Sequence, residues 1–331
     1  MGGDAGWRWL GAFWALVLGV VLIGGATLAW LGPPPATVQV AEAPPPVESG
    51  PPVAPHPPMA ALTPPAPGPA LPFVEPALVE ASAVGPLPRV APDGRSPMQA
   101  YARPFDARDT RPRLALIVGG LGLNASLSEQ AIATLPPTTG LAFSPYASRA
   151  LPLIEKARGL GFETLLALPL EPTNFPLNDP GDRALLTGLP LGENLARLDW
   201  LLARFPGHVG AVGALGSMRG ERFATMAEPF QAMQEVLARR GLLYFDPRPG
   251  FASPARAIGR SVNVVVDEPA TRAEIDLRLA TLERMARERG SALGYVGEAS
   301  PVAVARIAAW AAEVQNRGVA LAPPSALVQA R

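Results

Sequence analysis

Seven polar residues fall at the predicted ends of apolar strands, where side chains from different strands can meet. A pair of carboxylates such as Asp246 and Asp267 would suit acid and base catalysis of glycoside cleavage without a metal. Together with Glu298, the same carboxylates would suit a hard cation such as Ca²⁺ or Mg²⁺. We therefore predict a binding cleft at this rim, with these three residues as the candidate catalytic groups. The cleft candidates are Ser144, Glu171, Ser217, Asp246, Arg248, Asp267 and Glu298.

Each of these residues also has a structural interpretation. Asp246 and Arg248, in the segment FDPRPG, have the spacing to pair with one another and shape a proline turn. Glu171, in LEPTN, can accept hydrogen bonds from backbone amides of its own loop. Asp267 can simply end its strand, with the neighbouring Glu268 in solvent. The sequence alone leaves both interpretations open for each residue.

A glycine-rich turn follows the first strand of the predicted domain. Residues 120–125, GLGLNA, satisfy the loose G-x-G-x-x-A pattern of dinucleotide-binding proteins. That fold also places an acid at the end of the next strand, where it holds a ribose hydroxyl. Here the next strand ends in Phe143, Ser144 and Pro145, and the Gly-Lys-Ser/Thr of a P-loop does not occur. Dinucleotide binding therefore stays an alternative, but the acid that would hold the ribose hydroxyl is missing.

The composition excludes several kinds of chemistry. The 331 residues contain no cysteine, which excludes disulfides, thiolate zinc sites and thiol nucleophiles. The two histidines, His56 and His208, lie far apart in the sequence, which disfavours a site built on paired imidazoles. The formal net charge is zero and the arginines do not cluster, so we expect no nucleic-acid partner.

Apolar segments alternate with amphipathic segments from residue 113 to residue 325, which predicts a mostly parallel sheet covered by helices. The pattern fits either a barrel or a doubly wound sheet, and both place their chemistry where strands end. The clearest helix has a capping box of Thr271 and Glu274 at its start and Gly290 at its end. The predicted strands are 113–118, 139–143, 163–168, 209–213, 242–245, 262–266, 292–296 and 318–322. The predicted helices are 126–134, 149–159, 192–204, 224–240, 253–258, 271–289 and 300–316.

Two segments precede this domain. Residues 9–31 are uncharged and apolar, with tryptophans near both ends, and are long enough to cross a bilayer as one helix. We expect an uncleaved transmembrane anchor within 1–31, and Arg8 favours an inside N-terminus. Residues 32–112 contain runs such as GPPPA and TPPAPGPALP, which predict a disordered proline-rich linker. The folded domain is then 113–331.

Four segments recur in an order typical of one protein family. The chain resembles the divergent polysaccharide deacetylase family, periplasmic relatives of the chitooligosaccharide deacetylases, over nearly all of 113–325. This resemblance implies an α/β fold, a distorted (β/α) barrel of the glycoside hydrolase/deacetylase type. It also implies a carbohydrate-related role and, in active members, a divalent metal that activates water. The segments are LPPTTGLAFSPYA (135–147), LLALPLEPTNFPLNDPG (165–181), GAVGALGSM (210–218) and RRGLLYFDPRP (239–249).

The positions that would bind this metal are substituted. The family ends its first strand in two aspartates, whereas this chain has Gly119 and Gly120. The two histidines that the family places after later strands are replaced by Ala214 and Glu298. Zinc normally needs three protein ligands placed together, and His208 precedes the fourth strand, toward the opposite end of a barrel. The resemblance therefore predicts a degenerate metal site at these four positions, with no zinc and no other cofactor.

From this resemblance and the apolar segment 9–31 we expect a membrane-anchored extracytoplasmic protein with a carbohydrate or cell-envelope role. It would be a degenerate enzyme that acts as a glycan- or protein-binding module. The expected location is the inner membrane, single-pass, with the C-terminal domain in the periplasm. The expected partners are an envelope glycan or a membrane or periplasmic protein, with the lipid bilayer bound through residues 9–31. The alternatives are an active hydrolase on an envelope polysaccharide, using carboxylates at the barrel mouth, and a dinucleotide-binding protein.

Overall fold

The computed structural model describes residues 9, 13–23, 66–72 and 74–328. The chain divides into two units, Met1–Ala60 and Ala61–Arg331. In the first unit, residues 13–23 are helical. The remainder of the expected anchor and the expected linker as far as residue 65 lie outside the described residues. Among the residues that are described, no helix is both long and apolar enough to cross a membrane.

Parallel strands form a curled sheet at the centre of the second unit. Consecutive strands lie side by side, and the last long strand returns to pair with the first. A short strand near the C-terminus pairs with the start of the first strand. In sheet order the strands are β8 (Gly259–Ser261), β7 (Leu243–Asp246), β6 (Gly210–Val212), β5 (Thr164–Ala167), β4 (Gly140–Phe143), β3 (Arg113–Leu121), β10 (Ser291–Val296) and β9 (Val264–Val265), with β11 (Ala320–Leu321) beside β3.

One segment, residues 259–265, joins the two edges of this sheet. Its first part, β8, pairs with β7, and its second part, β9, pairs with β10. Backbone hydrogen bonds continue across the step between them. The N–H of Val262 donates to the carbonyl of Asp246 at 2.9 Å, and the N–H of Asn263 donates to the carbonyl of Leu293 at 2.8 Å. The strands thus follow one another around the sheet in sequence order, which is consistent with a (β/α) barrel rather than a doubly wound sheet.

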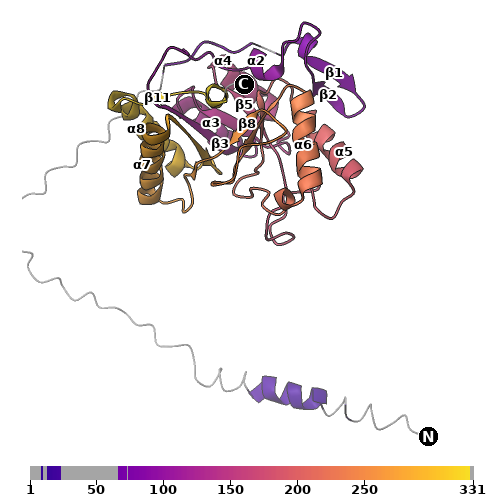
Figure 1. Cartoon of the computed structure of the whole chain (residues 1–331). Helices are drawn as coiled ribbons and strands as arrows, with labels where there is room; N and C mark the ends of the chain where they lie inside the picture. The colour runs from indigo at the N-terminus through magenta and orange to yellow at the C-terminus, as the bar shows by residue number, and fades with distance from the viewer. Residues whose placement is uncertain (1–8, 10–12, 24–65, 73, 329–331) are drawn as a thin grey trace, which may run out of the picture. The chain divides into compact units, whose positions relative to one another are not determined.

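Helices connect the strands and cover the sheet. In Figure 1, α5 and α6 lie side by side at one side of the sheet, and α7 and α8 lie at the other. The predicted ends of α7 are confirmed, because Thr271 Oγ1 accepts from the N–H of Glu274 and Gly290 ends the helix with a φ of 79°. The second bond of the predicted capping box is not formed, since the N–H of Thr271 donates to the carbonyl of Pro269 at 2.9 Å. The helices are α3 (Ala125–Thr134), α4 (Ala150–Gly159), α5 (Leu191–Leu202), α6 (Ala227–Arg239), α7 (Arg272–Arg289) and α8 (Pro301–Val314), with 3₁₀ turns η2 (Phe223–Thr225), η3 (Gln315–Arg317) and η4 (Pro324–Leu327).

The predicted helix over 253–258 is wrong. The chain between β7 and β8 has no regular structure there. Pro254 cannot donate a backbone hydrogen bond, and the N–H of Arg256 donates to Gln234 Oε1 of α6 at 3.1 Å instead of to a helical carbonyl. As a result, no helix connects β7 to β8 at the segment that joins the two sheet edges.

Side chains of the strands alternate between two apolar cores. Ile117 and Phe245 belong to a core inside the curled sheet. Leu116 and Val118 belong to the larger core between the sheet and the helices. This alternation is the period-two pattern of a strand with both faces buried, and it leaves only the strand ends available for polar side chains.

The predicted boundary of the linker at residue 112 is wrong. Several described residues between 66 and 112 pack against the barrel, among them the buried Leu78, Leu87 and Tyr101. The N–H of Leu71 donates to the carbonyl of Arg158 at 2.9 Å. Apolar side chains placed between the prolines make this packing favourable, although proline removes backbone donors. The segment contains η1 (Pro76–Leu78), a hairpin of β1 (Val79–Ser82) and β2 (Gly85–Pro88), and the short helix α2 (Pro97–Ala100).

Candidate functional site

The predicted site residues lie where the parallel strands end, and the structure separates them into three groups. The first group surrounds Glu298 and includes Asp267, Ser217 and the glycines of β3. The second is the pair of Asp246 and Arg248. The third group lies after β4 and β5 and consists of Ser144 and Glu171.

The Glu298 carboxylate lies in the space beside two glycines. A Cβ on Gly120 would collide with Glu298 Oε2, and a Cβ on Gly216 would collide with Glu298 Oε1. Both glycines are in the left-handed region, with φ of 72° and 60°, which side chains rarely adopt. A side chain at position 120 and the present position of Glu298 are therefore mutually exclusive.

Asp267 holds the loop that carries Glu298. Its two carboxylate oxygens accept from the backbone N–H groups of Gly297 and Glu298, each at 3.0 Å. Burial and, to a smaller extent, the charge of Asp267 raise the pKa of Glu298 above its ordinary value. Tyr295 closes the site from below, since its buried hydroxyl donates to the carbonyl of Gly216 at 2.8 Å.

Asp246 and Arg248 form a buried ion pair, as the structural interpretation predicts. Arg248 donates to Asp246 from Nε at 2.9 Å, from Nη2 at 2.6 Å and from its backbone N–H at 3.1 Å. The guanidinium also lies over the rings of Phe230 and Phe251, at 5.2 and 4.3 Å from their centroids. The Asp246 carboxylate is therefore engaged by its neighbour.

The structural interpretation also holds for Glu171. This buried carboxylate accepts from the N–H of Thr187 and pairs with Arg222 Nε at 3.2 Å. The buried hydroxyl of Ser144 accepts from the N–H of Tyr146 at 3.2 Å. Ser217 differs from both, because it is exposed, beside Gly297.

A charged loop that the sequence analysis missed connects these groups. In residues 219–222, RGER, Arg219 forms an ion pair with Glu268, and its Nε lies 3.6 Å from Glu221. Arg222 pairs with Glu171. Burial by itself would lower the pKa of Arg248. The carboxylate of Asp246 and, more weakly, Tyr244 and Glu221 outweigh burial, so that the pKa is raised. The loop after β6 thus contacts residues that follow β5 and β9. Its alternating charges directly after Ser217 were the available signal.

The glycine turn after β3 does not present a free helix N-terminus. The side chain of Asn124 caps α3 by accepting from the N–H of Leu127 at 3.1 Å. The Ser128 hydroxyl accepts from the N–H of Gly122 at 2.9 Å. With these donors satisfied and no acid after β4, the geometry gives the dinucleotide alternative no support.

The residues at this site do not fit a zinc ion. A Cβ on Gly119 would lie 2.9 Å from both the carbonyl of Gly297 and the hydroxyl of Tyr295, so the space beside it is already filled. The methyl group of Ala214 is buried in the core inside the sheet. Across the described part of the chain, no three His, Cys, Asp or Glu side chains are grouped so that they could hold a metal. His208 is buried just before β6, at the other end of that strand, with Nδ1 3.0 Å from the carbonyl of Gly210.

Comparison with known proteins gives a family match and several related folds. The family model of the divergent polysaccharide deacetylases matches residues 116–328. The chain is similar to an uncharacterized protein from Agrobacterium tumefaciens C58, with 34% identity and a TM-score of 0.67 over 74% of this chain and 100% of that chain. No curated protein matches the chain.

Two further solved structures are similar at low identity. One is the catalytic domain of the peptidoglycan N-acetylglucosamine deacetylase from Eubacterium rectale ATCC 33656, with 8% identity and a TM-score of 0.40 over 67% of this chain and 91% of that chain. The other is a family 4 carbohydrate esterase from Streptomyces lividans, with 13% identity and a TM-score of 0.37 over 65% of this chain and 98% of that chain.

Proposed function

Because the chain belongs to the divergent polysaccharide deacetylase family, we propose that it is a degenerate member of that family. In this proposal it acts at the cell envelope as a glycan- or protein-binding module and does not hydrolyse its ligand. The observation that carries the proposal is the position of the Glu298 carboxylate beside Gly120 and Gly216. The Glu298 side chain occupies the space that a side chain at position 120 of β3 would need.

The other carboxylates of the mouth support the same proposal. Asp246 is held by Arg248, and Asp267 accepts two backbone hydrogen bonds. A general base must be free to reach the attacking water, whereas both of these carboxylates are held in place by donors of the fold. Of the three candidate catalytic residues, only Glu298 has a carboxylate without a hydrogen bond or ion pair to the described residues.

Exposed apolar side chains near the strand ends support a binding role. Leu123 follows β3, Leu177 lies in the loop after β5, Met226 lies just before α6, and Phe251 follows β7. All four are exposed, and Leu177 is 92% accessible to solvent. Single exposed apolar residues are ordinary, but apolar residues in the loops after β3, β5, β6 and β7 suit contact with the apolar face of a sugar ring or with another protein.

The envelope location belongs to the proposal as well. Residues 9–31 would anchor the chain in the inner membrane as a single pass, and the proline-rich residues up to 65 would serve as a spacer. The barrel would then lie in the periplasm, within reach of envelope glycan. The composition of these two segments supports this arrangement.

The test combines an activity assay with a binding assay on the full-length protein. We expect no acetate release from N-acetylated chitooligosaccharides or from purified peptidoglycan. We expect co-sedimentation with peptidoglycan, or with a captured envelope protein, to be lost in Leu177→Asp. The matched control is Leu151→Asp, an exposed leucine on α4, which should bind like the wild type. Acetate release by the wild type would refute the proposal.

One observation favours hydrolysis as a second candidate function. Burial and Asp267 raise the pKa of Glu298, as expected of a carboxylic acid that donates a proton to a leaving group. If the chain is such an enzyme, Glu298→Gln abolishes hydrolysis without lowering the melting temperature below that of the wild type. Equal activity in Glu298→Gln and the wild type would remove this candidate.

A further inference from the structure

A polar pocket lies next to the pair of Asp246 and Arg248. It is lined by Phe251, whose ring centroid lies 4.3 Å from the Arg248 guanidinium, but by none of the seven predicted site residues. It has a volume of about 550 Å³ and follows the segment that joins the two sheet edges, between the end of α7 and the C-terminal turn η4. Pockets of this size hold sugar-sized ligands. We call it the seam pocket. Its lining includes Arg260, Asn263, Met285, Arg289, Leu327 and Val328.

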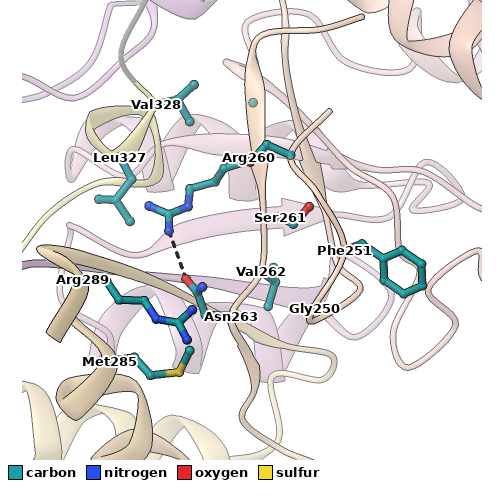
Figure 2. A pocket seen from close by; sticks show the side chains of 12 residues that line it. Gly250, Phe251, Arg260, Ser261, Val262, Asn263, Met285, Arg289, Leu327 and Val328 are labelled. Carbon is teal, nitrogen blue, oxygen red and sulfur yellow. Dashed lines mark hydrogen bonds between the residues drawn. The ribbon is translucent and has the colours of Figure 1, made fainter. Parts of the chain in front are cut away.

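Two arginines extend into this pocket from different elements. In Figure 2, Arg260 extends from β8 and Arg289 from α7, with Asn263 between them. None of the lining residues is acidic. Arg240, by contrast, pairs with the carboxylates of Glu80 and Asp199. The seam pocket is therefore a local excess of positive charge.

Arg260 is held in place by neutral groups only. Its Nη1 donates to Ser291 Oγ at 3.0 Å, and its Nη2 donates to Asn263 Oδ1 at 3.1 Å. A guanidinium has five N–H donors, so three remain for a ligand. Burial lowers the pKa of Arg260 below its ordinary value, and no neighbouring carboxylate offsets that cost.

Arg289 and Asn263 add further donors. Arg289 is exposed and has no hydrogen-bond or ion-pair partner among the described residues. The Oδ1 of Asn263 accepts from Arg260 and from the N–H of Leu293 at 2.8 Å. This fixes the amide so that its Nδ2 is left to donate. Three side chains thus offer hydrogen-bond donors at one place, without an acceptor of matching charge.

We propose that the seam pocket binds a sugar-sized ligand through a phosphate or carboxylate group held by Arg260 and Arg289. Guanidinium groups bind both oxyanions with paired, charge-assisted hydrogen bonds. Met285, Leu327 and Val328 supply apolar surface for the body of the ligand. The pocket shares Phe251 with the exposed apolar residues of the barrel mouth but includes none of the seven predicted site residues, and the proposal does not depend on the function proposed there.

The experiment is calorimetric titration of the full-length protein with glucose 6-phosphate, with glucuronate and with glucose. We expect saturable binding of at least one of the two anionic sugars and none of glucose, and the tighter anion identifies the group that the pocket prefers. Arg289→Gln should weaken that binding at least tenfold. This arginine is exposed and unpaired, so its substitution is expected to leave the fold intact, which thermal melting checks.

The matched control is Arg272→Gln, at the other end of α7, where an exposed arginine also lacks a partner among the described residues. It removes the same charge outside the pocket and should leave binding unchanged. Arg260→Gln, with an unchanged melting temperature, should weaken binding as Arg289→Gln does. The proposal is overturned if neither anionic sugar binds saturably, if glucose binds equally well, or if Arg272→Gln weakens binding as much as Arg289→Gln.

Discussion

The Glu298 carboxylate lies against the backbone of Gly120, in the space that a side chain at position 120 would occupy. Glu298 follows β10, and Gly120 lies near the end of β3, which pairs with β10 in parallel. The two positions are therefore neighbours because of the strand order. A substitution at one position therefore changes which side chains fit at the other, and the two residues have to be considered as a pair.

We predict that Gly120→Ala destabilises the protein more than Gly94→Ala does. Both glycines have a left-handed φ, of 72° and 86°, and a side chain in that region costs about 1–2 kcal/mol. Only at Gly120 would the new Cβ also collide with Glu298, while nothing lies within 4 Å of a Cβ on Gly94. Urea denaturation measures both losses of unfolding free energy.

The control for this comparison is the Glu298→Ala background. There the extra loss at Gly120 should shrink, because the colliding carboxylate is gone. Equal losses for the two alanine variants, in both backgrounds, would contradict the proposed relationship between Gly120 and Glu298.

Asp246→Asn should destabilise the fold, in contrast to the effect expected for a free catalytic base. The side chains of Asp246 and Arg248 are only 4% and 10% exposed, and removing one partner of a buried ion pair costs about 3 kcal/mol or more. Glu288→Gln breaks the exposed pair with Arg284 and should cost less than about 1 kcal/mol. Thermal melting of the two variants checks this difference. A variant Asp246→Asn as stable as the wild type would show that the carboxylate is available for other chemistry.

The buried His208 should make stability depend on pH. Burial lowers the pKa of its imidazole from 6.5 to about 4, and the charge of Arg158 acts in the same direction, against a hydrogen bond with Gly210. Between these values the unfolded chain binds the proton and the folded chain does not. Stability therefore falls as the pH drops from about 6.5 to about 4, by up to about 3 kcal/mol.

The measurement for His208 is the free energy of unfolding as a function of pH, in the wild type and in His208→Gln. Carboxylates also titrate at the lower end of this range, so the difference between the two curves is the relevant quantity. It should change between pH 6.5 and pH 4 and stay constant above pH 7.5. Parallel curves would show that His208 titrates alike in the folded and unfolded chains.

Glu298→Gln should stabilise the folded protein at neutral pH. Because burial and Asp267 raise the pKa of Glu298, the folded chain holds this proton more tightly than the unfolded chain does. With glutamate at position 298, the protein therefore becomes less stable as the pH rises from the ordinary pKa of a glutamate toward the raised value. With glutamine at this position, that loss does not occur. Denaturation at pH 3.5 and pH 7.5 tests this, with Glu129→Gln, an exposed residue of α3, as the control. A larger gain for Glu129→Gln than for Glu298→Gln would reverse the expected order.

Most of the alternating strands and helices could be predicted from the sequence, because their signals are local. The N-cap Thr271, the closing Gly290 and the apolar face of α7 lie within one helix and could be identified without the fold. The alternation of strands and helices likewise indicated a sheet covered by helices, and the family resemblance indicated a barrel. The match over 116–328 confirms that resemblance.

The errors came from contacts between distant segments. Proline content indicated a linker to residue 112, but Leu78 and Tyr101 are buried against the barrel, and burial depends on a surface that composition does not describe. The predicted helix over 253–258 does not form, because the N–H of Arg256 donates to Gln234 of α6. The partners of Arg219 and Arg222 were also hidden, because they follow other strands.

The measurement that tests the central claim most directly is the zinc content of the full-length protein after zinc loading and dialysis. Three or more protein ligands would be needed to retain the ion, and Gly119, Gly120 and Ala214 offer none. We predict that the protein retains no more zinc than a sample of Glu298→Gln treated in parallel. Retention of one zinc per chain, lost in Glu298→Gln, would contradict the account and make the barrel mouth a metal site.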